Sequence, residues 1–186
     1  MRQFDIAVVG GGLLGRCLAW RASRAGACVV LYEAGSSRGE NSAAWAAAGM
    51  IAPTTEAIGV DPEIASMGKH SLSLWPRWLA ELPEPVFYRD SGTLMLWHRE
   101  DAGEAVRARK RLASQQLQIK QTDTAELEPA LGTRFPEALY APNEAQVDNR
   151  AFLKAVSIAL VEAEVECHWE TFVDDAALLI LIPKHS

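Results

Sequence analysis

The amino-acid sequence predicts an α/β fold in which a doubly wound parallel sheet is interrupted by an inserted α+β segment. Residues 5–34 have the order strand, glycine-rich turn, helix, strand that opens such a sheet. A run of short strands and helices at about 84–147 breaks this alternation. A helix and a strand near 148–169 then provide a third parallel strand, so the simplest arrangement is one sheet split by an insertion.

The turn at residues 10–15, GGGLLG, has the spacing G-x-G-x-x-G. Gly10 permits the tight turn out of the strand at 6–9, and Gly12 lets a pyrophosphate approach the backbone. Gly15 lets the following helix pack closely on that strand. The free N–H groups at the start of the helix favour phosphate, so the turn predicts a dinucleotide site.

The elements around this turn strengthen the prediction. The helix expected at 13–24 has an apolar face made of Leu14, Cys17, Leu18, Ala22 and Ala25. A second apolar run at 28–32 ends in Glu33, where an acid would meet ribose hydroxyls and disfavour a 2′-phosphate. NAD or FAD is therefore expected rather than NADP, and a glycine-rich turn without a ligand is the alternative.

Composition is that of an ordinary globular protein. The 186 residues are 49% hydrophobic and 23% charged, enough for one domain or two small ones. The net charge of −6 argues against a nucleic-acid partner, and no apolar run approaches membrane-spanning length. The three cysteines lack metal-binding spacing, and their odd count predicts a reducing, cytoplasmic location.

The segment at 43–48, AAWAAA, is almost free of large side chains. It predicts either a short alanine helix packed on the sheet or a backbone that passes beside a planar cofactor, and the residues alone do not separate the two.

The rest of the chain divides into recognisable elements. A helix is expected at 62–82 with a kink or break at Pro76, and strands at 86–89 and 93–97 are expected to pair through the turn at 90–92. Further elements are expected as a helix at 100–116, a strand at 119–121, a capped short helix at 123–131, a strand at 138–141, a helix capped by Asp148 or Asn149 and running to 163, and a strand at 165–169. The predicted domains are 1–83 and 148–175 for the nucleotide-binding part, 84–147 for a partial substrate domain, and 176–186 for an atypical tail.

Four pieces of sequence together resemble the FAD-dependent D-amino-acid oxidase class, the glycine oxidases of thiamine biosynthesis in particular. They are VVGGGLLG at 8–15, LYEAG at 31–35, AAAGMIAP at 46–53 and VDNR at 147–150, with weaker support from SGTLML at 91–96. The resemblance covers about residues 4–173. It implies a Rossmann-like FAD-binding domain and part of a substrate domain, incomplete at the C-terminus.

The resemblance also implies a set of cofactor-binding residues and no metal. They are Gly10, Gly12, Leu13, Leu14 and Gly15 at the pyrophosphate, Glu33 at the adenosine ribose with Ala34 beside it, Ser42, then Ala48, Gly49 and Met50 beside the isoalloxazine ring, and Val173 at the adenine. One departure is that Ala43 and Ala44 replace the hydroxyl pair that usually contacts phosphate or ribityl oxygens.

The implied reaction is oxidation of the C–N bond of glycine, or of a similar small amino acid or amine, to an imine, with oxygen reduced to hydrogen peroxide. No protein side chain is required as acid or base, so His70, His98, His168 and His185 are expected to be surface or packing residues. A relative acting as sarcosine oxidase or D-amino-acid dehydrogenase is one alternative. A non-catalytic truncated fragment is the other, because family members are about twice this length and residues 174–186, DDAALLILIPKHS, do not resemble them. An unpaired edge at 165–169 would favour a homo-oligomer.

Overall fold

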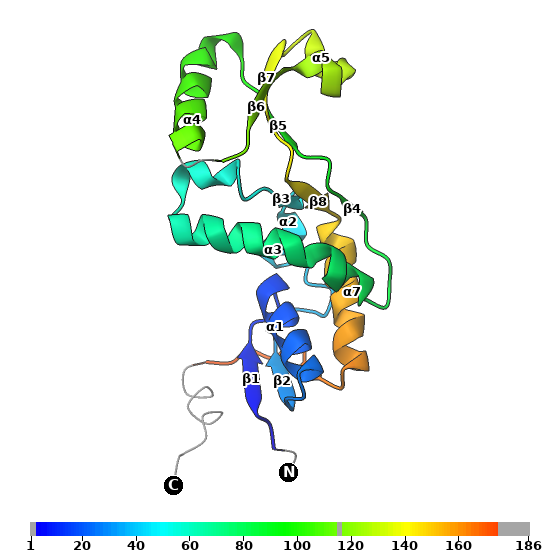
Figure 1. The fold of residues 1–186 in the computed structure, drawn as a ribbon. Coiled ribbons are helices and arrows are strands. Elements are labelled where there is room, and N and C mark those ends of the chain that lie inside the picture. Colours follow the sequence, from blue (N-terminus) through cyan, green and yellow to red (C-terminus); the bar gives the residue numbers. More distant parts are fainter. Residues whose placement is uncertain (1–2, 115–116, 175–186) are drawn as a thin grey trace. The chain divides into compact units, whose positions relative to one another are not determined.

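The computed structural model describes residues 3–114 and 117–174 (Figure 1). They form two compact units. The parallel unit contains residues 3–49, 79–87 and 148–174, and the antiparallel unit contains 50–78 and 88–147. The tail at 176–186 and His185 lie outside the described residues. The predicted domain boundaries stay a prediction.

The parallel unit is a three-stranded sheet with helices on it (Figure 1). Its elements are β1 (Ile6–Val9), α1 (Leu13–Arg24), β2 (Val29–Tyr32), α2 (Ala43–Ala46), α7 (Asn149–Glu162) and β9 (Glu166–His168). The strand order is β1-β2-β9, and both pairings are parallel, with Ile6 opposite Val29 and Tyr32 opposite His168. The chain therefore returns to the first sheet with its third strand, as the sequence predicts.

The core of the parallel unit lies between β2 and the two long helices. Val29, Val30 and Leu31 are buried, as are Trp20 of α1 and the side chains of α7 that face it. The predicted apolar face of α1 is wrong, because Leu14 is 83% exposed and Leu18 is 54% exposed. The buried face instead carries Arg16, Ala19 and Trp20, which share the same helical spacing.

Helix α3 and the segment at 43–48 each differ in part from the prediction made from the sequence. Helix α3 (Pro62–Ala80) continues through Pro76, so no break occurs there. The alanine segment does form a short helix, α2, whose first turn is capped by Ser42 through a hydrogen bond from the Trp45 N–H. It packs against α7 and ends at Ala47, where the backbone becomes extended.

The antiparallel unit contains two small sheets. Its remaining elements are β3 (Met50–Ile51), η1 (Glu56–Gly59), β4 (Tyr88–Arg89), β5 (Thr93–Met95), η2 (Arg99–Asp101), α4 (Ala102–Ser114), β6 (Lys120–Asp123), α5 (Thr124–Leu127), α6 (Pro129–Gly132), β7 (Glu137–Ala141) and β8 (Ala145–Val147). The strand orders are β3-β8-β4 and β5-β7-β6, and all pairings are antiparallel.

The predicted hairpin of residues 86–97 is wrong. β4 pairs with β8 and β5 pairs with β7, so the two strands lie in different sheets. The turn signal at Asp90–Gly92 is real, because Gly92 has φ +80° and its N–H donates to Glu144 O at 3.0 Å. That turn leads the chain from β4, which pairs with β8, to β5, which pairs with β7. Strands β8 and β7 occupy the centres of the two sheets.

Within the described ranges, no helix combines the length and apolar character that crossing a membrane requires.

Candidate cofactor site

The glycine loop has the close packing that its spacing predicts. Gly10 has φ +103°, a region that glycine enters without strain, and its N–H donates to Tyr32 O at 2.8 Å. A Cβ added to Gly15 would lie 1.8 Å from Gly10 O. The strand and the helix therefore meet at a distance that a side chain at residue 15 would prevent.

An open space lies at the N-terminus of α1. Gly12 is the N-cap residue, and the first intrahelical bond runs from Arg16 N to Gly12 O at 3.0 Å. A Cβ added to Gly12 would meet nothing within 4 Å. The first-turn N–H groups have no partner inside the helix, and the helix dipole makes this end positive. This geometry fits a pyrophosphate at Gly12, Leu13 and Leu14.

Glu33 is held beside the loop at the end of β2. Its Oε2 accepts a hydrogen bond from Gly11 N at 2.5 Å, and its Oε1 accepts one from Gly35 N at 2.6 Å. Each carboxylate oxygen can accept a further bond, so the group can still meet ribose hydroxyls. Ala34 is exposed next to it.

Residues after β9 lie alongside Glu33. Thr171 N donates to Glu33 O at 2.8 Å, which brings the segment leading to half-buried Val173 next to the end of β2. Val173, which is predicted to meet the adenine, therefore comes shortly after Thr171, whose backbone is hydrogen-bonded to Glu33, the residue predicted at the ribose.

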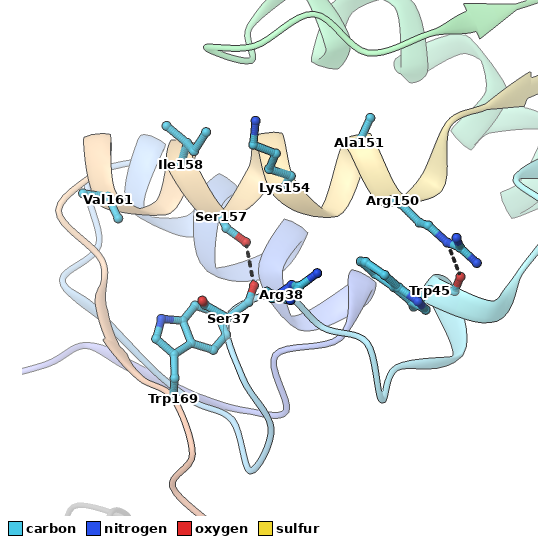
Figure 2. A pocket seen from close by; sticks show the side chains of 10 residues that line it. All are labelled: Ser37, Arg38, Trp45, Arg150, Ala151, Lys154, Ser157, Ile158, Val161 and Trp169. Carbon is cyan, nitrogen blue, oxygen red and sulfur yellow. Dashed lines mark hydrogen bonds between the residues drawn. The ribbon is translucent and has the colours of Figure 1, made fainter.

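The two motifs AAAGM and VDNR are joined by hydrogen bonds in the structure. Asn149 Nδ2 donates to Ala44 O and to Ala47 O, the latter at 2.8 Å. Arg150 Nε donates to Trp45 O at 3.1 Å, and its guanidinium lies over the Trp45 ring at 5.0 Å (Figure 2). Asp148 caps α7 through the N–H groups of residues 150 and 151, which fixes the start of the helix.

This bonding leaves the small-residue segment accessible. The side chains of Ala46, Ala47 and Ala48 are exposed, whereas Gly49 is buried with φ +73°. An exposed backbone without bulky side chains fits the flat face of an isoalloxazine ring. Met50 belongs to the antiparallel unit, where it pairs with Gln146 in the β3–β8 ladder and is 52% exposed.

Ser42 is engaged within its own loop. Its Oγ donates to Gly39 O at 2.7 Å and accepts from Trp45 N at 3.3 Å. The role of Ser42 at the cofactor therefore stays a prediction, as do the roles of the other site residues.

Arg16 is a site residue that sequence reasoning missed. The side chain is buried, and its Nε donates to Gly11 O at 2.5 Å. Nη1 donates to Ser37 O at 2.9 Å, to Leu153 O at 3.2 Å and to Ser157 Oγ. The one signal for it in the sequence is a charged residue directly after the glycine motif.

A groove of about 870 Å³ lies between α7 and the loop at 37–45 (Figure 2). It is lined by Ser37, Arg38, Trp45, Arg150, Ala151, Lys154, Ser157, Ile158, Val161 and Trp169. Two of its cations already have partners in the chain, because Arg150 bonds Trp45 O and Lys154 Nζ pairs with Glu84 at 2.8 Å. None of the predicted cofactor residues lines this groove.

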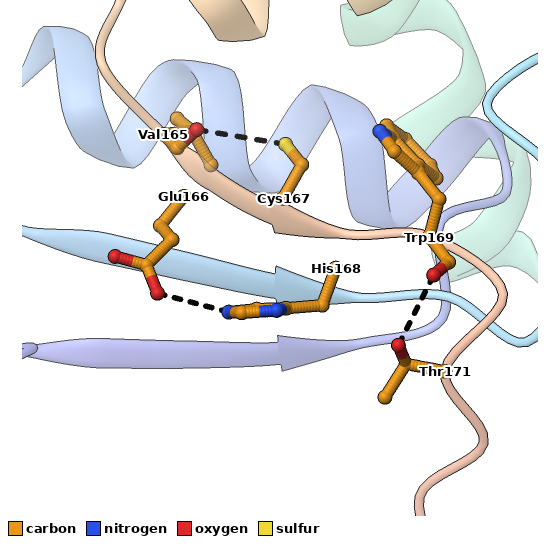
Figure 3. A network of polar contacts seen from close by, with 6 residues as sticks. All are labelled: Val165, Glu166, Cys167, His168, Trp169 and Thr171. Atoms are coloured by element: carbon orange, nitrogen blue, oxygen red, sulfur yellow. Dashed lines mark hydrogen bonds and ion pairs between the residues drawn. The ribbon is translucent and has the colours of Figure 1, made fainter.

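The described histidines have packing or surface partners. His168 stacks on Tyr32 with ring centroids 4.9 Å apart, and its Nε2 lies 2.9 Å from Glu166 Oε1 (Figure 3). His98 packs against Phe135, and His70 is exposed. Burial raises the pKa of the Cys17 thiol to about 12 and also raises the pKa of Cys167. In residues 3–114 and 117–174, no group of three or more His, Cys, Asp or Glu is arranged to hold a metal ion.

Comparison with known proteins finds similar sequences and similar folds. A ThiO protein of Rhizobium etli, named as a thiamine biosynthesis oxidoreductase, is 32% identical over 160 residues, which are 86% of this chain and 47% of that protein. The glycine oxidase of Geobacillus kaustophilus superposes with a TM-score of 0.82 at 24% identity, over 93% of this chain and 48% of that one. The glycine oxidase of Bacillus cereus gives 0.76 at 20% identity, with the same two coverages of 93% and 48%.

These matches also give the share of each relative's length that the chain covers. The chain spans about half the length of each of these three proteins. The sequence pattern of the DAO family matches residues 5–178, which is nearly the whole chain. The chain therefore belongs to the DAO family of FAD-dependent oxidoreductases.

Proposed function

We propose that this chain binds FAD in its parallel unit and serves the oxidation of the C–N bond of glycine or a similar small amino acid or amine. The products are the imine and hydrogen peroxide, so oxygen is the second substrate. The observation that carries the proposal is the open helix N-terminus at Gly12 beside the fixed carboxylate of Glu33. The likeness to ThiO supports a place in thiamine biosynthesis.

The chain's own residues would hold the cofactor in three places. Backbone N–H groups at Gly12, Leu13 and Leu14 would bind the pyrophosphate, and Glu33 would accept hydrogen bonds from the ribose. The backbone near Val173 would meet the adenine. The bound FAD would accept the hydride of the substrate and pass the electrons to oxygen.

The exposed segment at Ala47 and Ala48 would lie against the ring, with buried Gly49 directly after it. Asn149 would hold this segment in place through its hydrogen bonds to Ala44 O and Ala47 O. We assign no side chain the role of acid or base, so orientation and water exclusion are the tasks that we propose for the protein. A cytoplasmic location and a homo-oligomer belong to the same proposal.

The first experiment is an absorbance spectrum of the purified chain after incubation with FAD and gel filtration. Flavin bands that co-elute with the protein support the proposal, and their absence overturns cofactor binding by this chain. Glu33→Gln should weaken FAD binding by about tenfold, because a charge-assisted acceptor beside Gly11 is lost. Glu40→Gln, an exposed carboxylate in the next loop, is the matched control and should leave binding unchanged.

Turnover then tests the reaction. Peroxide release is measured with glycine, sarcosine and D-alanine, and dye reduction is measured without oxygen. Peroxide formed from glycine supports the proposed oxidase. Preference for sarcosine, or dye reduction without peroxide, would instead indicate a sarcosine oxidase or a dehydrogenase. Retained flavin without turnover on any substrate would show a cofactor-binding chain without activity.

A further inference from the structure

The glycine loop has little intrinsic rigidity. Residues 10–12 are three consecutive glycines, and glycine loses more conformational freedom on folding than any other residue. The peptide between Gly11 and Gly12 is planar and trans, so its C=O and its N–H point in opposite directions. If the Gly11 C=O faces the interior, the Gly12 N–H faces outward, where it can bind an anion. If the peptide is turned over, the C=O faces the anion instead.

The structure fixes this choice from both sides of Gly11. The Gly11 N–H is bound by Glu33 Oε2, and the Gly11 C=O is bound by Arg16 Nε, each at 2.5 Å. Gly11 is buried, and an added Cβ would lie 2.8 Å from Glu33 Cβ and 2.9 Å from Trp169 Cζ3. With the Gly11 carbonyl turned toward the buried guanidinium, the Gly12 N–H points away from Arg16. Gly12 also borders open space, because a Cβ added to it would meet nothing within 4 Å.

Arg16 is itself held by three other parts of the parallel unit. Its Nη1 donates to Ser37 O, Leu153 O and Ser157 Oγ, and its guanidinium lies 4.9 Å from the centre of the Trp169 ring. The side chain is 0% exposed, so its position is determined by the fold rather than by solvent.

The charge of Arg16 is not neutralised by a direct ion pair. Its hydrogen-bond acceptors among the described residues are all uncharged, and the carboxylates of Glu33 and Glu40 act on its charge only from beyond ion-pair distance. Its Nη2 is buried and has no hydrogen-bond partner among the described residues. Burial lowers the pKa of Arg16, yet a guanidinium stays protonated in proteins. A buried cation of this kind favours an anion nearby.

We propose that Arg16 is a positioning residue for the cofactor's pyrophosphate. It holds the Gly11 carbonyl inside the protein so that the Gly12 N–H faces the phosphates, and its buried charge favours their binding. This inference rests on the proposed FAD site, and it adds a residue outside the glycine motif to that site.

The test separates binding of the phosphates from binding of the nucleoside. Affinities for ADP and for adenosine are measured by calorimetry on the full chain and on Arg16→Gln. We expect the preference for ADP over adenosine to fall by about tenfold or more in R16Q, because the phosphate contacts are charge-assisted. Equal weakening of both ligands, or of neither, would overturn the proposal.

Arg24→Gln is the matched control. It removes one positive charge from the far end of the same helix, where Arg24 pairs with Glu81 at 3.5 Å on the surface. Its preference for ADP should stay within about twofold of the unmodified chain, since an exposed ion pair contributes little. Arg16→Lys keeps the charge but not the fork of donors, so its preference should fall less than in R16Q. An unchanged preference in R16K would overturn the role of the guanidinium.

A second measurement needs no ligand and also covers the case in which R16Q is unstable. In the apo chain, ¹⁵N relaxation of the Gly11 and Gly12 amides should report an ordered loop that becomes mobile in R16K and, where it folds, in R16Q. An equally ordered loop in these variants would overturn the proposal. If the unmodified chain has an ordered loop but binds neither ADP nor FAD, the proposed cofactor function fails, and with it the pyrophosphate role of Arg16.

Discussion

The two units of this chain achieve order around their irregular segments in different ways. In the parallel unit, the segments near the candidate site are nearly free of side chains, and polar groups from distant positions fix their backbone. Arg16, Glu33 and Asn149 each bind a glycine or alanine peptide group. In the antiparallel unit, the backbone is fixed mainly by strand pairing, with β7 and β8 at the centres of the two sheets.

Glu144 is a comparable polar anchor in the antiparallel unit. Glu144 is 1% exposed, and its carboxylate accepts hydrogen bonds from Thr54 N and Thr55 N, both at 2.7 Å. It ties a loop to the turn between β7 and β8, whereas the anchors of the parallel unit surround an open space. The comparison shows that a backbone segment without large side chains, as at the candidate site, is held in one conformation by hydrogen bonds from side chains outside that segment.

The largest expected effect would come from Gly15→Ala. A Cβ 1.8 Å from Gly10 O cannot be accommodated, so strand and helix must separate, at a cost of more than about 3 kcal/mol in the free energy of unfolding. Urea unfolding followed by circular dichroism measures it. Gly103→Ala in α4 is the control in the other unit, because the added Cβ would meet only Arg107 Nη1, at 3.8 Å. That substitution should be neutral or stabilising, and similar losses for both would contradict the comparison.

Thiol chemistry reports on the parallel unit alone, since Cys17, Cys28 and Cys167 all belong to it. With the pKa of Cys17 raised from 9.0 to about 12, its thiolate population near pH 8 should be about a thousandfold lower than that of an unshifted thiol. Raising the pH should therefore speed its alkylation up to about pH 12. Mass spectrometry of iodoacetamide adducts tests this, and rapid labelling of Cys17 at pH 8 would refute it.

Removing the polar anchor of the antiparallel unit should cost less. Glu144→Ala would leave the buried N–H of Thr54 and the partly buried N–H of Thr55 without acceptors, which should destabilise this unit by about 2–4 kcal/mol. Glu144→Gln keeps one acceptor oxygen and should lose less. Hydrogen exchange at Thr54 and Thr55 locates the effect, and unchanged protection there in the alanine variant would argue against the anchor.

The smallest stability effect is expected for Asn149→Ala. Loss of the bonds to Ala44 O and Ala47 O should cost about 1–2 kcal/mol and shift the visible spectrum of any bound flavin. Asn143→Ala is the control, because Asn143 is exposed and its side chain donates a hydrogen bond to the side chain of Gln118, at 2.7 Å. An Asn149 variant with the stability and spectrum of the control would show that α2 is held by packing alone.

Local patterns predicted the parallel unit better than the antiparallel one. The glycine spacing and the apolar runs located β1, α1 and β2, and Asp148 was recognised as a helix cap. These signals act over a few residues, and the elements they specify need no distant partner to be recognised. In the antiparallel unit, the predicted strand pairing was wrong, because a turn at Asp90–Gly92 is compatible both with a hairpin and with the observed pairing in two sheets.

The residues that complete the candidate site escaped prediction for the same reason. Arg16 bonds Leu153 O across 137 positions of the sequence, and Asn149 bonds Ala47 O across 102. Neither pairing has a signature in a short window. The periodic pattern of apolar residues also predicted the wrong buried face of α1, because Arg16 is charged and is nevertheless buried, with backbone carbonyl groups as hydrogen-bond acceptors.

The long reach of Arg16 has a consequence for the order of folding. The loop at Gly10–Gly12 is made early in synthesis, but the α7 carbonyl that helps to hold Arg16 and the β9 strand that completes the sheet are made more than a hundred residues later. Contacts of such high sequence separation form slowly, because loop closure must precede them. A nascent chain would therefore carry the nucleotide motif without the means to order it until α7 and β9 are made, and competence to bind a cofactor would arise only then.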